Sequence, residues 1–132
     1  MNKLYPLLLL LFLVACTSSP KRERPAEWQG EWTARWETLP ESYPGVEDMQ
    51  FYMNGNFLFS EDRLTITSKG FKGCIFHPDT TSHTQSWYIS SDTLFVLNGP
   101  DALGLSYLIK SRSDDQIELQ LLEDIFITLT RN

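Results

Sequence analysis

The chain consists largely of short runs in which apolar and polar residues alternate, separated by turn-forming residues. Alternation with a period of two is typical of a strand that buries one face of a sheet. The clearest run spans residues 28–37. A helix is the competing interpretation, because tryptophans recur every four residues, but Gly30 and Thr33 disfavour it and only a strand places every polar residue outward. The expected inward side consists of Trp28, Gly30, Trp32, Ala34 and Trp36.

A second run leads from Met49 through Phe51 and Met53 into Asn54-Gly55. Asn-Gly between alternating apolar residues is a strong hairpin signal, because both residues tolerate the positive φ angles of a type I′ turn. We therefore expect a two-residue turn at this point. It would pair Phe51 with Leu58 and Tyr52 with Phe57, and it would leave Tyr52, Phe57 and Phe59 on the outer face.

Further short runs continue to the C-terminus, with breaks rich in Gly, Pro, Asn, Asp and Ser. About nine short strands with hairpin-length gaps predict an all-β domain over residues 28–132, a small antiparallel up-and-down arrangement of about 8–9 strands. A sandwich and a closed β-barrel both fit, and the barrel is favoured because closure removes exposed edges. The later strands are expected at residues 63–68, 71–76, 86–90, 93–97, 105–110, 116–122 and 125–131.

The charge balance argues against one class of partner. The 132 residues include 11 Lys and Arg against 17 Asp and Glu, a formal net charge of −6. Nucleic acid, which attracts basic surfaces, is therefore not expected to bind. Of the two cysteines, Cys74 lies in an apolar, strand-like setting, where a buried and inert thiol is favoured. The sequence shows no phosphate-binding glycine loop, and no cofactor is expected.

The N-terminus has the features of an export signal. An apolar run covers residues 7–15, too short to span a membrane, and Lys3 supplies a positive flank. Leu13-Val14-Ala15-Cys16 resembles the bacterial lipobox, which directs lipidation and cleavage at its cysteine. The resemblance implies a lipoprotein signal peptide at residues 1–15 and a lipidated Cys16 as the first mature residue. The alternative is a signal peptide that is cut elsewhere.

Residues 16–27 are then expected to form the lipidated N-terminus and a flexible linker, because two prolines and small polar residues can bury little apolar surface. The acyl chains on Cys16 would hold the protein to a membrane, either the outer membrane or another part of the cell envelope. The acidic run that follows the cysteine in surface-exported lipoproteins of similar type is absent. The comparison favours the periplasmic face.

Gly30-Glu31-Trp32 near the start of the first strand and Arg131 near the end of the last resemble the pattern of the lipocalins and the wider calycin group. Over residues 28–131 the chain is similar to small lipocalin-like lipoproteins of Bacteroidetes. The resemblance implies that Gly30, Trp32 and Arg131 close one end of the barrel, with the basic side chain over the indole. The second lipocalin motif and a C-terminal helix are not evident.

The resemblance also implies a role in binding a small hydrophobic or amphipathic ligand. We expect Trp36, Phe51 and Trp87 to line its site. A barrel of this size is equally compatible with an interior filled by its own side chains. The alternative function is then a non-catalytic envelope module that docks another protein, through exposed Tyr52, Phe57 and Phe59.

Catalytic and metal-binding patterns are weak. The chain has no G-x-S-x-G elbow, and its adjacent acidic pairs are typical of solvated turns, so an enzyme is not expected. Cys74, His77, Asp79 and His83 are residue types that ligate transition metals. A metal site at Cys74, His77 and His83 is retained as an alternative, although the histidines flank a polar loop where such residues are ordinary.

Overall fold

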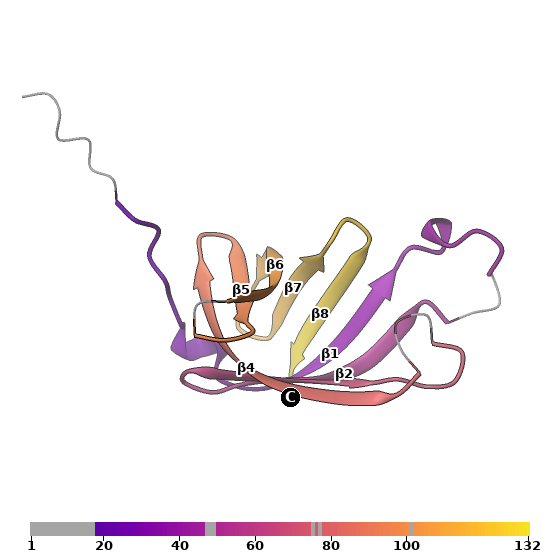
Figure 1. Ribbon diagram of the computed structural model, residues 1–132, viewed down its shortest axis with the longest axis horizontal. Helices are drawn as coiled ribbons and strands as arrows, with labels where there is room; N and C mark the ends of the chain where they lie inside the picture. Colours follow the sequence, from indigo (N-terminus) through magenta and orange to yellow (C-terminus); the bar gives the residue numbers. More distant parts are fainter. Residues whose placement is uncertain (1–17, 47–49, 75, 77, 101) are drawn as a thin grey trace, which may run out of the picture.

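The computed structural model describes residues 18–46, 50–74, 76, 78–100 and 102–132. Eight antiparallel strands follow one another in chain order and close into a barrel, with β1 beside β8 (Figure 1). This confirms the predicted all-β antiparallel up-and-down barrel. Within the described ranges, two short 3-10 helices accompany the strands, η1 (Ala26–Trp28) and η2 (Pro40–Ser42). The strands are β1 (Gly30–Thr38), β2 (Tyr52–Phe59), β3 (Arg63–Lys69), β4 (Thr80–Ser90), β5 (Thr93–Leu97), β6 (Leu103–Arg112), β7 (Gln116–Leu121) and β8 (Ile125–Arg131).

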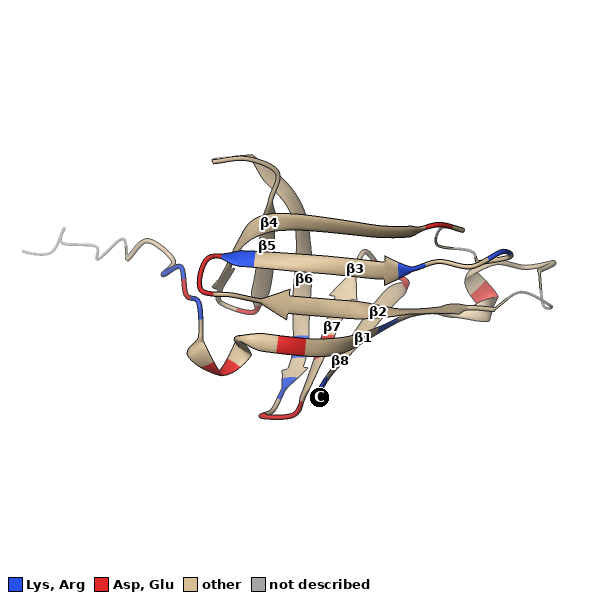
Figure 2. Ribbon diagram, turned by 90° about the horizontal axis from the view of Figure 1, so that it is seen from below, with Lys and Arg blue, Asp and Glu red and all other residues tan. Residues whose placement is uncertain are grey.

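Strand β4 is longer than predicted and changes partners along its length. Residues 80–86 pair with β3, and residues 86–90 pair with β5. Figure 2 shows β1, β2, β3 and β4 side by side, with β4 as the outermost strand of this layer. The first half of β4 therefore projects beyond the end of β5.

Aromatic side chains fill the barrel. Their rings form a continuous row in which Trp36 lies 5.7 Å from Phe57, Phe57 lies 6.0 Å from Phe59, and Phe59 lies 4.9 Å from Trp87. Trp28 stacks on Trp87 at 6.4 Å and covers one end of the row. Such offset and edge-to-face contacts are the preferred packing of aromatic rings. Aliphatic side chains complete the core, all of them buried: Leu64, Ile89, Leu94, Val96, Ile117, Leu119, Ile127 and Leu129.

The predicted turn at Asn54-Gly55 is wrong, because both residues lie inside β2. Gly55 faces the barrel interior opposite Ala34, and a Cβ there would lie against the carbonyl oxygen of Thr67 and 2.7 Å from Trp36. The glycine thus permits β2 to lie close to Thr67 of β3 and to the indole ring of Trp36. The chain instead turns after β2, where the Ser60 amide donates to the Arg63 carbonyl oxygen.

The strand predicted at residues 71–76 is also absent from the described part of this segment. Gly73 has a φ of 90°, and the Cys74 amide donates to the Phe71 carbonyl oxygen at 3.0 Å, which closes a turn. Cys74 is buried, and Phe71 and Phe76 pack against the core. The apolar residues that suggested a strand cover the barrel from a loop.

The end of the expected flexible linker lies against the barrel. Glu23 and Ile89 exchange two backbone hydrogen bonds of 2.7 Å, as an added strand would. The Arg22 guanidinium lies 4.5 Å from the centre of the Tyr88 ring. Backbone pairing needs no apolar side chains, so the composition of the segment did not predict it. We call residues 21–25 the arm; Figure 1 shows the chain leaving the barrel from this segment.

Candidate functional site

The residues expected to close the barrel meet at one end. The Arg131 guanidinium lies 4.1 Å from the centre of the Trp32 ring, within cation–π distance. The same side chain donates to the carbonyl oxygens of Gln29, at 3.2 Å, and Glu27. Gly30 has a φ of 113°, which allows the chain to pass from η1 into β1 close to the arginine.

The three residues expected to line a ligand site do not share one surface. Trp87 is 0% exposed and lies beneath Trp28, whereas Trp36 is 6% exposed and packs on Phe57 further along the barrel. Phe51 lies outside β2, half-buried, with its ring 6.2 Å from Tyr43. The structure therefore brings none of these side chains to a common opening.

The expected outer aromatic face is wrong for two of its three residues. Because β2 continues through Gly55, Phe57 and Phe59 point into the barrel and are 0% and 1% exposed. Tyr52 stays partly exposed on the outside, with the Arg35 guanidinium 4.0 Å from its ring centre.

The alternative metal site is only partly within the described residues. Cys74 is a buried free thiol, and His83 is exposed on β4 opposite Ile66. His77 lies outside the described residues, as does Cys16. Across the described ranges, no three His, Cys, Asp or Glu side chains form a group able to hold a metal ion.

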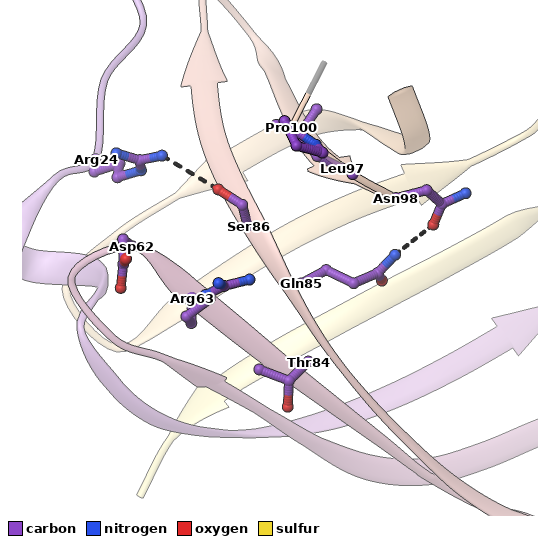
Figure 3. Close-up of a pocket in the computed structure, with 10 residues that line it drawn as sticks. Arg24, Asp62, Arg63, Thr84, Gln85, Ser86, Leu97, Asn98 and Pro100 are labelled. Carbon is purple, nitrogen blue, oxygen red and sulfur yellow. Dashed lines mark hydrogen bonds between the residues drawn. The ribbon is translucent and has the colours of Figure 1, made fainter. Parts of the chain in front are cut away.

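A polar pocket of about 440 Å³ lies on the outer face of the barrel, where β4 changes partners. Figure 3 shows Arg24, Asp62 and Arg63 on one side of β4, and Asn98 with its loop on the other. Thr84 and Ser86 lie between the two sides, on the strand itself. The volume falls within the range of small-molecule sites, although this pocket is more polar than most of them.

The arm positions one of the two arginines. The Nε atom of Arg24 donates to the Trp87 carbonyl oxygen at 2.6 Å, and its Nη2 atom lies 3.4 Å from Ser86 Oγ. A guanidinium has five N–H donors, so three remain for a ligand. The pairing of Glu23 with Ile89 fixes the backbone beside it. Arg24 is thus oriented before any ligand binds.

The second arginine comes from β3. The register of β3 and β4 places Arg63 opposite Ser86. Within the described part of the chain, the guanidinium groups of Arg24 and Arg63 form no ion pair with a carboxylate. Asp62 lines the same pocket and leaves it with one net positive charge. The pocket is therefore suited to a single anionic group.

The remaining lining groups offer hydrogen bonds. Thr84 and Ser86 carry hydroxyls, and Gln85 donates to the side-chain oxygen of Asn98 across the pocket (Figure 3). Leu97 and Pro100 add apolar surface. Hydroxyl and amide groups beside two guanidiniums can bind a carboxylate or phosphate on a polyhydroxylated body.

Sequence patterns alone do not indicate this site. They place Arg24 in the linker and Arg63 at the start of a strand. Three basic residues between positions 21 and 24 of an acidic chain are the one signal that could have drawn attention to the arm. The position of Arg63 beside Ser86 depends on strand register, which a single sequence specifies poorly.

Comparisons of the chain with protein-family models, with curated proteins and with solved structures find no match. No helix within the described ranges is long and apolar enough to cross a membrane. The closed eight-stranded antiparallel barrel is consistent with a calycin-like fold.

Proposed function

We propose that this protein is a lipid-anchored binding protein of the cell envelope, without catalytic activity, that recognises its ligand through a carboxylate or phosphate group. The observation that carries the proposal is the pair of arginines at the outer pocket, which form no ion pair with the described carboxylates. Guanidinium groups bind both anions through paired hydrogen bonds, and the shared chemistry defines the ligand class.

The packing of the core is the reason for placing the ligand outside the barrel. Trp36, Phe57 and Trp87 occupy the interior with 6%, 0% and 0% of their surfaces exposed. A ligand in the interior would have to displace these rings, each of which contributes a large buried area. The outer pocket needs no such displacement.

The proposed anchor is the acylated Cys16, on the periplasmic face of the outer membrane or elsewhere in the envelope. The arm supports a short tether, because Glu23 is already paired with Ile89 on the barrel. About six residues would then connect the lipid to the barrel, an extended reach of roughly 20 Å. The pocket lies beside the arm and would stay near the membrane surface.

Calorimetric titration of the full-length protein in detergent tests the ligand class. Glucuronate and glucose 6-phosphate are the charged probes, and glucose is their neutral counterpart. We expect both charged sugars to bind and glucose to bind at least tenfold more weakly, because a charge-assisted hydrogen bond is worth about 1.5–3 kcal/mol. Equal affinity for all three sugars, or binding of none, would contradict the proposal.

A matched pair of variants localises the binding. Arg63→Gln removes one pocket guanidinium and should weaken glucuronate binding about tenfold or more. Lys69→Gln makes the same change of charge at the other end of β3, about 20 Å away, and should change the affinity less than twofold. Similar losses in the two variants would indicate a general charge effect.

A further inference from the structure

Within the described residues, the first half of β4 has a neighbouring strand on one side only. Residues 80–85 pair with β3 on one side, but β5 ends at Leu97, opposite Ser86. Among the described residues, no backbone hydrogen bond outside the β3 pairing involves residues 80–85. The first half of β4 is therefore an open edge of about 17 Å.

The direction of the free backbone groups follows from the other half of the strand. Ile89 exchanges its N–H and C=O bonds with Glu23, and the Trp87 carbonyl oxygen accepts from Arg24, both on the β3 side of β4. Successive residues of an antiparallel strand direct these groups to opposite sides. The regular register of β3 and β4 keeps this alternation. Ser82 and Thr84 thus point their N–H and C=O groups to the open edge.

This edge lacks the features that prevent strand addition. Residues 80–86 include no charged residue and no proline, and the pairing with β3 has no bulge. On the outer face, the hydroxyls of Thr84 and Thr65 lie 2.8 Å apart, and those of Ser82 and Thr67 lie 3.1 Å apart. These contacts keep β4 in register while its edge stays accessible.

The open edge leads into the outer pocket, because Thr84 belongs to both. The two arginines lie across β4 from this edge, on its β3 side, and they line the same pocket as Thr84. We propose that the ligand of the pocket is an extended polypeptide segment, which pairs with Ser82 and Thr84 as an added strand and directs an acidic side chain across β4 to Arg24 and Arg63. The proposal rests on the pocket being the binding site of the proposed function. Every pair in the barrel is antiparallel, so we assign the antiparallel direction, with the acidic residue near the N-terminus of the segment.

Four blocked peptides test the proposal by titration against the full-length protein. The first has the sequence Glu-Thr-Val-Thr-Val-Thr, the second replaces Glu by Gln, the third has the reversed sequence, and the fourth is the first with N-methylated backbone amides. We expect the first to bind at least tenfold more tightly than each of the others. Equal affinity for the N-methylated peptide or the reversed peptide would overturn the proposal, and so would equal affinity for the Gln peptide.

A variant of the edge separates the peptide inference from the pocket itself. Ser82→Pro removes an N–H that points away from β3, so it should weaken the first peptide at least tenfold and leave glucuronate binding unchanged. Ser82→Ala retains the N–H and should change peptide affinity less than twofold. If glucuronate binds the wild type but no peptide does, the peptide inference fails and the anion site stands. If no probe binds, both fail.

Discussion

The closed end of the barrel and the first half of β4 differ in how their strands are held together. At the closed end, Trp28, Phe59 and Trp87 are almost fully buried and their rings are in contact. Along the first half of β4, hydroxyl pairs such as Thr84 with Thr65 join the strands, and most side chains stay exposed. We call the first half of β4, with the part of β3 that pairs with it, the extension. The closed end depends on apolar packing, whereas the extension depends on backbone pairing and weak polar contacts.

This difference indicates that one region mainly stabilises the fold and the other is available to bind a ligand. Buried aromatic area is the larger stabilising contribution, but it leaves no room for a ligand at the closed end. The polar extension contributes less to folding, and it presents an edge and a pocket with donors available for a ligand. The comparison predicts that substitutions at the closed end act on folding and substitutions at the extension act on binding.

The largest effect should come from Trp87→Ala. This change removes a fully buried ring that stacks on Trp28 and donates from Nε1 to the Ser60 carbonyl oxygen at 3.2 Å. We expect the free energy of unfolding to fall by about 3–5 kcal/mol in urea denaturation. Trp87→Phe retains most of the ring area and should cost less than half as much. A loss below about 1 kcal/mol for the alanine variant would mean that the closed end is not the main source of stability.

A second prediction concerns the stability of the folded protein at high pH, which depends on the buried Tyr107. Burial raises the pKa of Tyr107 to about 12, whereas an unfolded tyrosine titrates near 10. The unfolded chain therefore loses this proton first as pH rises, so the free energy of unfolding should decline between pH 10 and 12, by about 2 kcal/mol at pH 12. Denaturation of the wild type and Tyr107→Phe across this range isolates the contribution, because the variant lacks the phenol. Parallel pH profiles for the two proteins would contradict a buried, neutral Tyr107.

A third prediction concerns the close contact of Gly55 with Thr67 and Trp36, at the position where the sequence predicted a hairpin turn. Gly55→Ala would place a Cβ against the Thr67 carbonyl oxygen and Trp36, so we expect a loss of about 1–3 kcal/mol. Asn54→Thr is the matched change at the exposed neighbouring position, where a β-branched residue suits a strand and would destabilise a type I′ turn. It should leave stability within about 0.5 kcal/mol of the wild type in thermal denaturation. Strong destabilisation by Asn54→Thr would argue for a turn.

The smallest effect should come from the extension. Thr67→Ala removes the hydroxyl contact with Ser82 on the exposed outer face. We expect it to cost less than about 1 kcal/mol, because an exposed hydrogen bond competes with water. Urea denaturation of Thr67→Ala and Trp87→Ala under the same conditions compares the contributions of the two regions to the free energy of unfolding. Equal losses of stability in the two variants would contradict the distinction between the closed end and the extension.

Much of the fold could be predicted because alternation and turn residues act locally. The run at residues 28–37 indicated most of β1, and the later runs indicated β5, β7 and β8 to within a few residues. The errors arose where a distant contact decided the structure. Gly55 is required by Thr67 and Trp36, which no local pattern reveals, and the turn at Gly73 folds apolar residues over the core from a loop.

The pocket could not be predicted for the same reason. Arg24 and Arg63 are distant in sequence, and they line one pocket only because the arm pairs with Ile89 and β3 aligns with β4. Both alignments use backbone hydrogen bonds, which form between residues of almost any type and so leave no recognisable pattern in the sequence. Trp36 and Trp87, two of the three aromatic residues expected to line a ligand site, instead fill the core, as large apolar side chains usually do.

Amide and indole NMR signals of the full-length protein, followed while glucuronate is added, test the central claim most directly. The account predicts that the amide signals of Thr84, Ser86 and Gly99 shift with ligand concentration. The indole N–H signals of Trp36 and Trp87, buried inside the barrel, should stay in place. Shifts of the indole signals without shifts at the pocket would place the ligand in the interior and contradict the account.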